Sequence, residues 1–307
     1  MEYIRGTTEF HLEEPSVISL GKFDGLHRGH ELLIESMLQK KKTGLKAVIF
    51  TFDIPPKNLA HQDEIKVLTT NNEKMHIFEQ IGIDYLIECP VTDEFMHMDP
   101  LDFIRKIVQE LRVKAMVVGK DFHFGHHRAG DYHTLEQYAK EFGYEVSAVD
   151  KMQYEDRDIS STFIREEVAA GNMEKANRLL GYHYFVQGVV EHGKHMGGPV
   201  LGLPTVNILP PADKLLPPFG VYVTETAIRD QIYQGISNVG CKPTIAGDNP
   251  VGVETHIFDF NRDVYGSEIR VDFLTRIRPE YKFHSLEDLK AQMMEDISFA
   301  RTFFSHY

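Results

Sequence analysis

Residues 16–30, SVISLGKFDGLHRGH, decide the fold of the N-terminal half. Residues 16–20 are an apolar run that predicts a short buried strand, and a helical pattern covers residues 30–42. The turn between them holds three glycines, which let the backbone approach a ligand closely. The helix start behind the turn offers free N–H groups and a partial positive charge, so the segment predicts a phosphate site at the carboxyl end of the strand.

The same alternation of strand and helix continues through the first half of the chain. The pattern predicts further strands at 46–52, 84–88, 115–119 and 145–149, and helices at 100–112 and 131–142. Asp99 followed by Pro100 predicts the cap of the first of these helices, and Gly143 predicts the end of the second. Short buried strands that alternate with helices are typical of a mostly parallel sheet covered by helices. We therefore expect a Rossmann-like α/β domain.

The pattern changes near residue 150. Two short helices are predicted at 162–170 and 173–180, and the strands that follow are predicted at 184–191, 204–208, 220–228, 231–237, 253–260 and 268–277. Strands separated by Gly, Pro and Asn turns predict a mainly antiparallel β-barrel, closed or nearly closed. An amphipathic helix ends the chain, with Ser285 as its cap and an apolar stripe of Leu286, Leu289, Met293, Ile297 and Ala300. We expect one domain over 1–181, including the two short helices, and a second over 182–307.

Composition narrows the class of protein. The chain has 307 residues, and its 33 Lys and Arg against 46 Asp and Glu give a formal net charge of −13. Such an acidic protein lacks the basic surface that binds a nucleic-acid backbone, but a small phosphorylated ligand needs only one local site. Two cysteines cannot form a disulfide framework and are expected to be buried. No signal-peptide pattern or membrane-length apolar run is visible, so we expect a cytoplasmic monomer or weak homo-oligomer without nucleic-acid or membrane partners.

His27 and His30 are the chemically active side chains of the turn. They lie three residues apart, so both can face one ligand and donate hydrogen bonds to phosphoryl oxygens. Two other interpretations remain: a solvated helix start with incidental histidines, and a metal site, for which the spacing supplies no third ligand. The strand–turn–helix context favours phosphate binding.

Three segments of the first half resemble one family. HRGH at 27–30 matches the HxGH signature of the nucleotidyltransferases, and the longer GKFDGLHRGH resembles the adenylyltransferase module of the bacterial bifunctional riboflavin kinase/FAD synthetases. VVGKDFHFG at 117–125, with Arg128 and Gly130, resembles that family's flavin-side loop, and ISSTFIR at 159–165 resembles its ISSTxIR segment. The order and approximate spacing of the three segments also match.

The resemblance implies roles for individual residues. It implies catalytic roles for His27, His30 and Arg165, in a reaction in which the FMN phosphate attacks the α-phosphorus of ATP and no protein group is covalently modified. It implies flavin contacts for Asp121, Phe122, Phe124 and Arg128, and ATP or phosphate contacts for Gly21, Phe23, Asp24, Gly25, Gly29, Ser161 and Thr162. Ordinary helix capping is the alternative for the hydroxyls, and a solvated loop is the alternative for His123, His126 and His127.

A second group of candidate site residues lies in the β-rich half of the chain. The loop GKHMGGPVLG at 193–202 can wrap phosphates with backbone N–H groups, chiefly at Gly193, Lys194, Gly197, Gly198 and Gly202. Thr205 and Asn207 in the PTVN segment share one face of an extended chain and offer neutral oxygens suited to Mg²⁺. Glu254, within a predicted strand, can serve as a general base.

PTVN followed by VETHIFDFN at 253–261 resembles the riboflavin kinase domain of the same family. The resemblance implies that Thr205 and Asn207 hold Mg²⁺ with ATP, and that Glu254 accepts the proton of the riboflavin hydroxyl that attacks the γ-phosphate. Taken singly, PTVN could be a turn at a sheet edge and Glu254 a surface residue. Pro199 stands where the family usually has an arginine, and loss of that guanidinium would weaken ATP binding.

The resemblance therefore implies a bifunctional enzyme of flavin cofactor synthesis. Its substrates and products would be ATP, riboflavin, FMN and FAD, and Mg²⁺ bound with ATP would be the only cofactor. Two alternatives remain: a single-activity FAD synthetase with a degenerate kinase domain, and a non-catalytic flavin-binding sensor. Pro199 in place of the family's usual arginine slightly favours both alternatives. The presence of Glu254 argues against the sensor, because flavin binding alone needs no general base.

Overall fold

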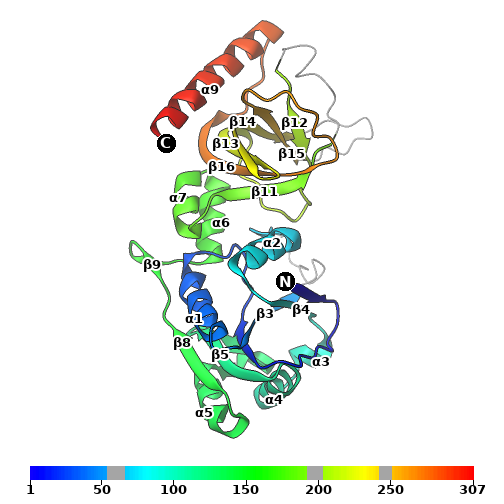
Figure 1. Cartoon of the computed structure of the whole chain (residues 1–307). Coiled ribbons are helices and arrows are strands. Elements are labelled where there is room, and N and C mark those ends of the chain that lie inside the picture. Colours follow the sequence, from blue (N-terminus) through cyan, green and yellow to red (C-terminus); the bar gives the residue numbers. More distant parts are fainter. Residues whose placement is uncertain (54–65, 192–202, 242–250) are drawn as a thin grey trace. The chain divides into compact units, whose positions relative to one another are not determined.

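The computed structural model describes residues 1–53, 66–191, 203–241 and 251–307 (Figure 1). Contacts between residues divide the chain into two compact units. Unit 1 spans Met1–Ile65 and Asn71–Ser161, and unit 2 spans Lys66–Thr70 and Thr162–Tyr307.

Unit 1 is built on a six-stranded, all-parallel sheet, as the alternation predicted. The strand order is β1-β4-β3-β2-β5-β8. The strands are β1 (Glu2–Arg5), β2 (Ser16–Leu20), β3 (Lys46–Asp53), β4 (Tyr85–Pro90), β5 (Val113–Gly119) and β8 (Glu145–Val149). Two short hairpins accompany the sheet: β6 (His123–Phe124) with β7 (Gly130–Asp131), and β9 (Gln153–Tyr154) with β10 (Arg157–Asp158).

Capping residues set the ends of helices in unit 1. The helices are α1 (Glu31–Lys41), α2 (Asn71–Ile81), α3 (Asp93–Met96), α4 (Pro100–Glu110) and α5 (Tyr132–Phe142). Asp99 caps α4 as predicted, since its carboxylate accepts a hydrogen bond from the N–H of Leu101 at 2.8 Å, with Pro100 at the first helical position. Gly143 ends α5 in the left-handed conformation. Helix α2 was not predicted from the sequence pattern.

Strand order decides where a ligand site can form in unit 1. Strand β2 lies between β3 and β5, so the chain first extends the sheet on one side of β2 and then crosses to the other side. In a parallel sheet this switch point leaves a crevice at the carboxyl ends of the two strands. The turn after β2 and the loop after β5 therefore share one edge of the sheet. Below them, Ile18, Val48, Ile87 and Met116 are fully buried in one core.

Unit 2 holds an antiparallel six-stranded sheet of order β11-β16-β13-β14-β15-β12, which curls into a half-barrel. The strands are β11 (Tyr184–Val189), β12 (Val206–Ile208), β13 (Gly220–Ile228), β14 (Gln231–Cys241), β15 (Val251–Ile257) and β16 (Glu268–Pro279). Two register shifts between β13 and β16 increase the local twist. Strands β11 and β12 are the two edges of this sheet. They approach each other where the N–H of Glu191, just after β11, donates to the carbonyl of Asn207 in β12 at 2.9 Å.

In the part of unit 2 that the structure describes, the helices are α6 (Ser161–Ala170), whose first residue groups with unit 1, α7 (Met173–Leu180) and α9 (Leu286–His306). Ser285 caps α9 as predicted, accepting from the N–H of Asp288 at 3.1 Å. Ile297 and Ala300 of the predicted stripe enter the apolar core with Val223 and Phe258 of the barrel. Figure 1 shows α9, coloured red, beside the strands of this unit.

The two short helices group with unit 2 by their contacts. Asn177 of α7 donates to the carbonyl of Phe273 in β16 at 2.8 Å and accepts from the N–H of Tyr184 in β11 at 2.7 Å. The expected domains over 1–181 and 182–307 place these helices with the N-terminal half, and that functional assignment stays a prediction.

Two smaller expectations concern cysteines and membranes. Cys89 is buried as expected, but Cys241 is exposed at the end of β14, so the prediction of a buried thiol was wrong there. Among the helices in the described ranges, none has the length and apolar character needed to cross a membrane.

Candidate functional sites

The turn after β2 is built around the ring of Phe23. Phe23 and Gly25 take left-handed φ angles of 47° and 70°, which reverse the chain and bury the Phe23 ring. That ring packs 5.1 Å from the ring of His30 and 5.8 Å from the ring of Phe78, between centroids. A Cβ atom at Gly21 would stand 3.1 Å from the Phe23 ring, so the first glycine leaves room for it.

His27 and His30 lie stacked in this turn, with centroids 3.9 Å apart and ring planes 25° from parallel. The Nδ1 atoms of both rings are buried and have no hydrogen-bond partner among the described residues. A Cβ atom at Gly29 would lie 2.9 Å from Nδ1 of His27 and 3.3 Å from the carbonyl oxygen of Ile159. Glycine is therefore required at position 29 for the His27 ring to pack as it does.

Burial controls the charge of the two imidazoles. It lowers the pKa of His27 to about 4, although the carboxylates of Asp24 and Asp121 act in the opposite direction. Burial and the neighbouring His27 also hold the pKa of His30 well below its ordinary value. Both rings are neutral at pH 7, and an unsatisfied buried ring nitrogen costs free energy until a ligand pairs with it. This arrangement fits a site prepared for a phosphate.

The segment ISSTFIR at 159–165, which contains the start of α6, is divided between the two units after Ser161. The Ser161 hydroxyl donates to the carbonyl of Asp24 at 2.7 Å, which ties the ISST segment to the glycine turn. Thr162 and Arg165 belong to unit 2, where Nε of Arg165 donates to the carbonyl of Lys66 at 3.1 Å. Their relation to the two histidines therefore stays a prediction.

The predicted flavin-side loop follows β5. The ring of Phe124 is 6% exposed and packs in the core, stacked 5.5 Å from the ring of Phe122 between centroids. Phe124 therefore supports the loop from beneath, while Asp121 and Arg128 are exposed. A Cβ atom at Gly130 would lie 2.8 Å from the Phe124 ring, which explains the glycine there. The flavin contacts of this loop stay predictions.

The loop after β5 contains three further histidines. His123 and His127 are exposed and His126 is half-buried. Within the ranges that the structure covers, no group of three or more His, Cys, Asp or Glu side chains could bind a metal ion.

The second candidate site lies on β12, β14 and β15 of the half-barrel. Strand register places Asn207 and Asn238 directly opposite Glu254 on either side, so the three side chains share one face of the sheet. The hydroxyl of Thr205 donates to Oε1 of Glu254 at 2.6 Å. The structure thus brings together the three residues that the PTVN and VETHIFDFN segments singled out, and adds Asn238.

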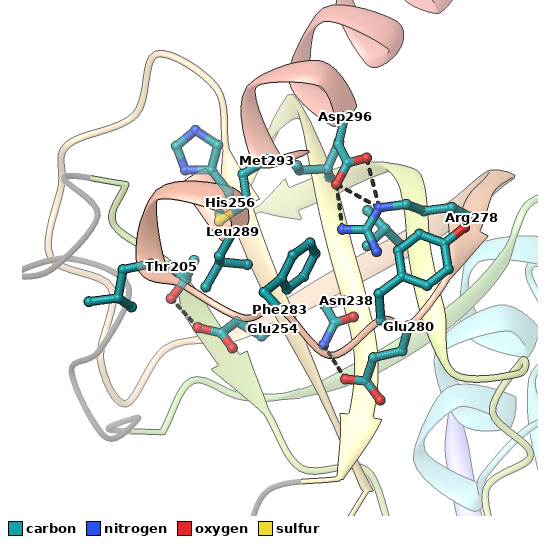
Figure 2. A pocket seen from close by; sticks show the side chains of 14 residues that line it. Thr205, Asn238, Glu254, His256, Arg278, Glu280, Phe283, Leu289, Met293 and Asp296 are labelled. Atoms are coloured by element: carbon teal, nitrogen blue, oxygen red, sulfur yellow. Dashed lines mark hydrogen bonds and ion pairs between the residues drawn. The ribbon is translucent and has the colours of Figure 1, made fainter. Parts of the chain in front are cut away.

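A cavity of about 470 Å³ opens beside Glu254 (Figure 2). Polar side chains in or next to the strands line one part of it, namely Thr205, Asn238, Glu254 and Glu280. Apolar side chains from α9 and the segment before it line another, namely Tyr281, Phe283, Leu286, Leu289 and Met293. A cavity with apolar walls and a few convergent polar groups is typical of a small-molecule site.

Comparison with known proteins covers both units. Residues 9–163 match the family model for FAD synthetase and residues 180–304 match that for riboflavin kinase. The bifunctional riboflavin kinase/FMN adenylyltransferase of Bacillus subtilis is 33% identical over 316 residues, which cover 100% of this chain and 99% of that protein. The chain belongs to the bifunctional riboflavin kinase/FMN adenylyltransferase family.

Other relatives agree over the same length. The family members from Listeria monocytogenes and Escherichia coli K12 are 33% and 34% identical, covering 97% and 95% of this chain and 96% and 94% of their own lengths. A crystal structure described as a macrolide-efflux protein from Streptococcus pneumoniae superposes with a TM-score of 0.85 at 30% identity, covering 97% of this chain and 98% of that one.

One part of the predicted kinase site cannot be placed. Gly193, Lys194, Gly197, Gly198 and Gly202, with Pro199 among them, lie outside the described residues. Their expected phosphate contacts stay predictions, as does the effect of Pro199.

Several cavity residues were missed by sequence reasoning. Asn238, Arg278 and Glu280 carry no local motif. Pairing of β14 with β15 brings Asn238 to the cavity, and pairing of β13 with β16 brings Arg278 there, with Glu280 just beyond the end of β16. The stripe Leu286, Leu289 and Met293 was visible, but its role as a cavity wall was not. For Asn238 the available signal was its place between the buried strand residues Ser237 and Val239; Arg278 and Glu280 carry no such signal.

Proposed function

We propose that this chain phosphorylates riboflavin with ATP to form FMN, and then adenylylates FMN with a second ATP to form FAD and pyrophosphate. The observation that carries the proposal is the match of both units, over nearly the whole chain, to bifunctional relatives. It favours two activities over a single-activity synthetase or a flavin sensor. The acidic composition, with a formal net charge of −13, supports a substrate-binding enzyme without a nucleic-acid partner.

In the kinase step, a riboflavin hydroxyl oxygen attacks the γ-phosphorus of ATP. The new O–P bond forms as the bond between the γ-phosphorus and the bridging oxygen breaks, and ADP leaves. Glu254 takes the hydroxyl proton, and its contact with Thr205 fixes the carboxylate at the edge of the cavity. Thr205 and Asn207 supply neutral oxygens, the ligand type that Mg²⁺ bound to ATP prefers.

In the adenylylation step, a phosphate oxygen of FMN attacks the α-phosphorus of ATP. The bond from the α-phosphorus to the bridging oxygen breaks, and pyrophosphate leaves without any covalent link to the protein. The chain must therefore align two anions and stabilise charge on the leaving group. The neutral rings of His27 and His30, whose Nδ1 atoms have no partner among the residues that the structure describes, support this role together with the glycine turn. Arg165 would add a positive charge.

Product analysis tests the proposal. The purified chain is incubated with riboflavin, ATP and Mg²⁺, and flavins are separated by chromatography over time. We expect FMN to form first and FAD to follow. FAD from supplied FMN without FMN from riboflavin would indicate a single-activity synthetase, and binding of flavin without either product would indicate a sensor.

A further inference from the structure

A buried ion pair joins α9 to the barrel at the wall of the cavity. Arg278, near the end of β16, donates from Nε to both carboxylate oxygens of Asp296, at 2.9 and 3.1 Å, and from Nη2 to Oδ2 at 2.8 Å. The two side chains are only 11% and 2% exposed. Figure 2 shows the pair bridging the helix and the strand. A forked, doubly hydrogen-bonded pair of this kind fixes orientation as well as distance.

The same guanidinium also holds the aromatic residues that precede α9. Its central carbon lies 5.1 Å from the centroid of the Tyr281 ring and 5.7 Å from that of Phe283. Both rings line the cavity, as do Arg278 and Asp296 themselves. On the helix, Nε2 of Gln292 donates to Asp296 at 3.3 Å. One cation thus organises the connecting segment and the helix that together form the apolar wall.

We infer that Arg278 and Asp296 are positioning residues for riboflavin, which set the place of the apolar wall that receives the flavin ring. The inference rests on the proposed kinase function and adds residues that no sequence motif marks. Figure 2 shows the pair apart from the Thr205–Glu254 contact, where the proposed phosphate chemistry takes place. Loss of the pair should therefore change riboflavin affinity and leave ATP affinity unchanged.

A second ion pair on the same helix supplies a matched control. Arg301 of α9 donates to Asp259, which follows β15, at 3.1 and 3.2 Å. These side chains are 54% and 80% exposed, and neither lines the cavity. An exposed pair contributes little to stability. Asp259→Asn therefore removes an arginine–carboxylate contact between α9 and the barrel without touching the cavity wall.

The first measurement compares Asp296→Asn with Asp259→Asn. For Asp296→Asn we expect the KM for riboflavin to rise at least about tenfold, with the KM for ATP and the adenylylation of FMN within about twofold of the unaltered chain. Quenching of riboflavin fluorescence on binding should show the same loss of affinity. Asp259→Asn should leave all four quantities unchanged. An unchanged riboflavin KM in Asp296→Asn would overturn the inference.

A second variant separates positioning from stability. Replacing a buried ion pair with apolar residues of similar volume usually preserves stability, whereas removing one partner leaves a buried charge. Arg278→Met with Asp296→Leu should therefore keep the thermal midpoint of the unaltered chain but retain the raised riboflavin KM, because Met cannot organise the two aromatic rings. A return of riboflavin KM to the original value in this variant would show a purely structural role and overturn the inference. If the unaltered chain forms no FMN, it is the proposed kinase function that fails.

Discussion

Glu254 and His27 show two ways in which neighbouring residues control the state of a candidate site residue. Glu254 is held in place by the Thr205 hydroxyl at the edge of a cavity that can admit a substrate. His27 is buried against His30, and its Nδ1 atom has no hydrogen-bond partner within the described part of the chain. The first residue is positioned by a hydrogen bond, and the second is made neutral by loss of solvent.

Glu254→Gln should abolish the kinase step and spare the adenylyl transfer. The amide keeps the shape of the side chain but cannot take the hydroxyl proton, so kcat for FMN formation should fall roughly 10²- to 10⁴-fold. Flavin chromatography with riboflavin or FMN as substrate measures the two steps separately. Simultaneous loss of both activities would argue against a base confined to one unit.

His27 should make the stability of unit 1 depend on pH. An unfolded histidine titrates near pH 6.5, whereas burial beside His30 lowers the folded pKa to about 4 despite Asp24 and Asp121. Between these values the unfolded state binds more protons, so the free energy of unfolding decreases as pH falls from 6.5 toward 4. The contribution of this one group is on the order of 3 kcal/mol.

His27→Gln should therefore reduce that pH dependence. We expect the thermal midpoint to fall less between about pH 7.5 and about pH 5 in the variant than in the unaltered chain. His30 is also held neutral by burial and will preserve part of the effect. Equal falls in the two proteins would contradict a neutral, buried His27.

At the scale of the elements, the curl of the second sheet depends on close approach of β11 and β12. A Cβ atom at Gly188 of β11 would lie 2.4 Å from Cγ2 of Ile208 in β12, and Ile208 is buried. The bond from the N–H of Glu191 to the carbonyl of Asn207 lies along the same seam. A side chain at position 188 would therefore push apart the strands that carry Asn207.

Gly188→Val should destabilise unit 2 by roughly 1–3 kcal/mol, the usual cost of overpacking. Thermal unfolding followed by circular dichroism measures the loss. Ile208→Ala in the same chain removes the atom that clashes, so the double variant should recover part of the stability that Gly188→Val loses. No recovery would mean that the two strands do not meet at this point.

For the whole molecule, division into two units predicts that the two activities can be supplied by different chains. The glycine turn with its histidines lies in unit 1, and the cavity with Glu254 lies in unit 2. Because FMN is a small molecule that can leave one site and enter another, neither step requires that both sites work in one chain.

A mixture of Glu254→Gln and His27→Ala chains should therefore convert riboflavin to FAD. Each variant alone should stop, the first at riboflavin and the second at FMN, while the mixture should form FAD after a lag in which free FMN accumulates. Chromatography over time measures the lag. FMN without FAD in the mixture would indicate that FMN must pass within one chain.

The features that the sequence alone determined are local ones. The strand–turn–helix pattern at 16–30, the Asp99 and Ser285 caps and the PTVN segment depend on residues a few positions apart, and the structure confirms the elements they predict. The alternation of strands and helices in the first half of the chain likewise predicted the parallel sheet. The strands separated by turns in the second half predicted the antiparallel sheet.

Only the tertiary structure decided which distant residues meet. The crossing from β4 to β5 places the loop of Asp121 beside the turn of His27, and strand register sets Asn238 beside Glu254. The pairing of Arg278 with Asp296 depends on how α9 lies against the barrel. Such contacts close long loops whose entropic cost is offset by burial across the entire core, so no short stretch of residues encodes them.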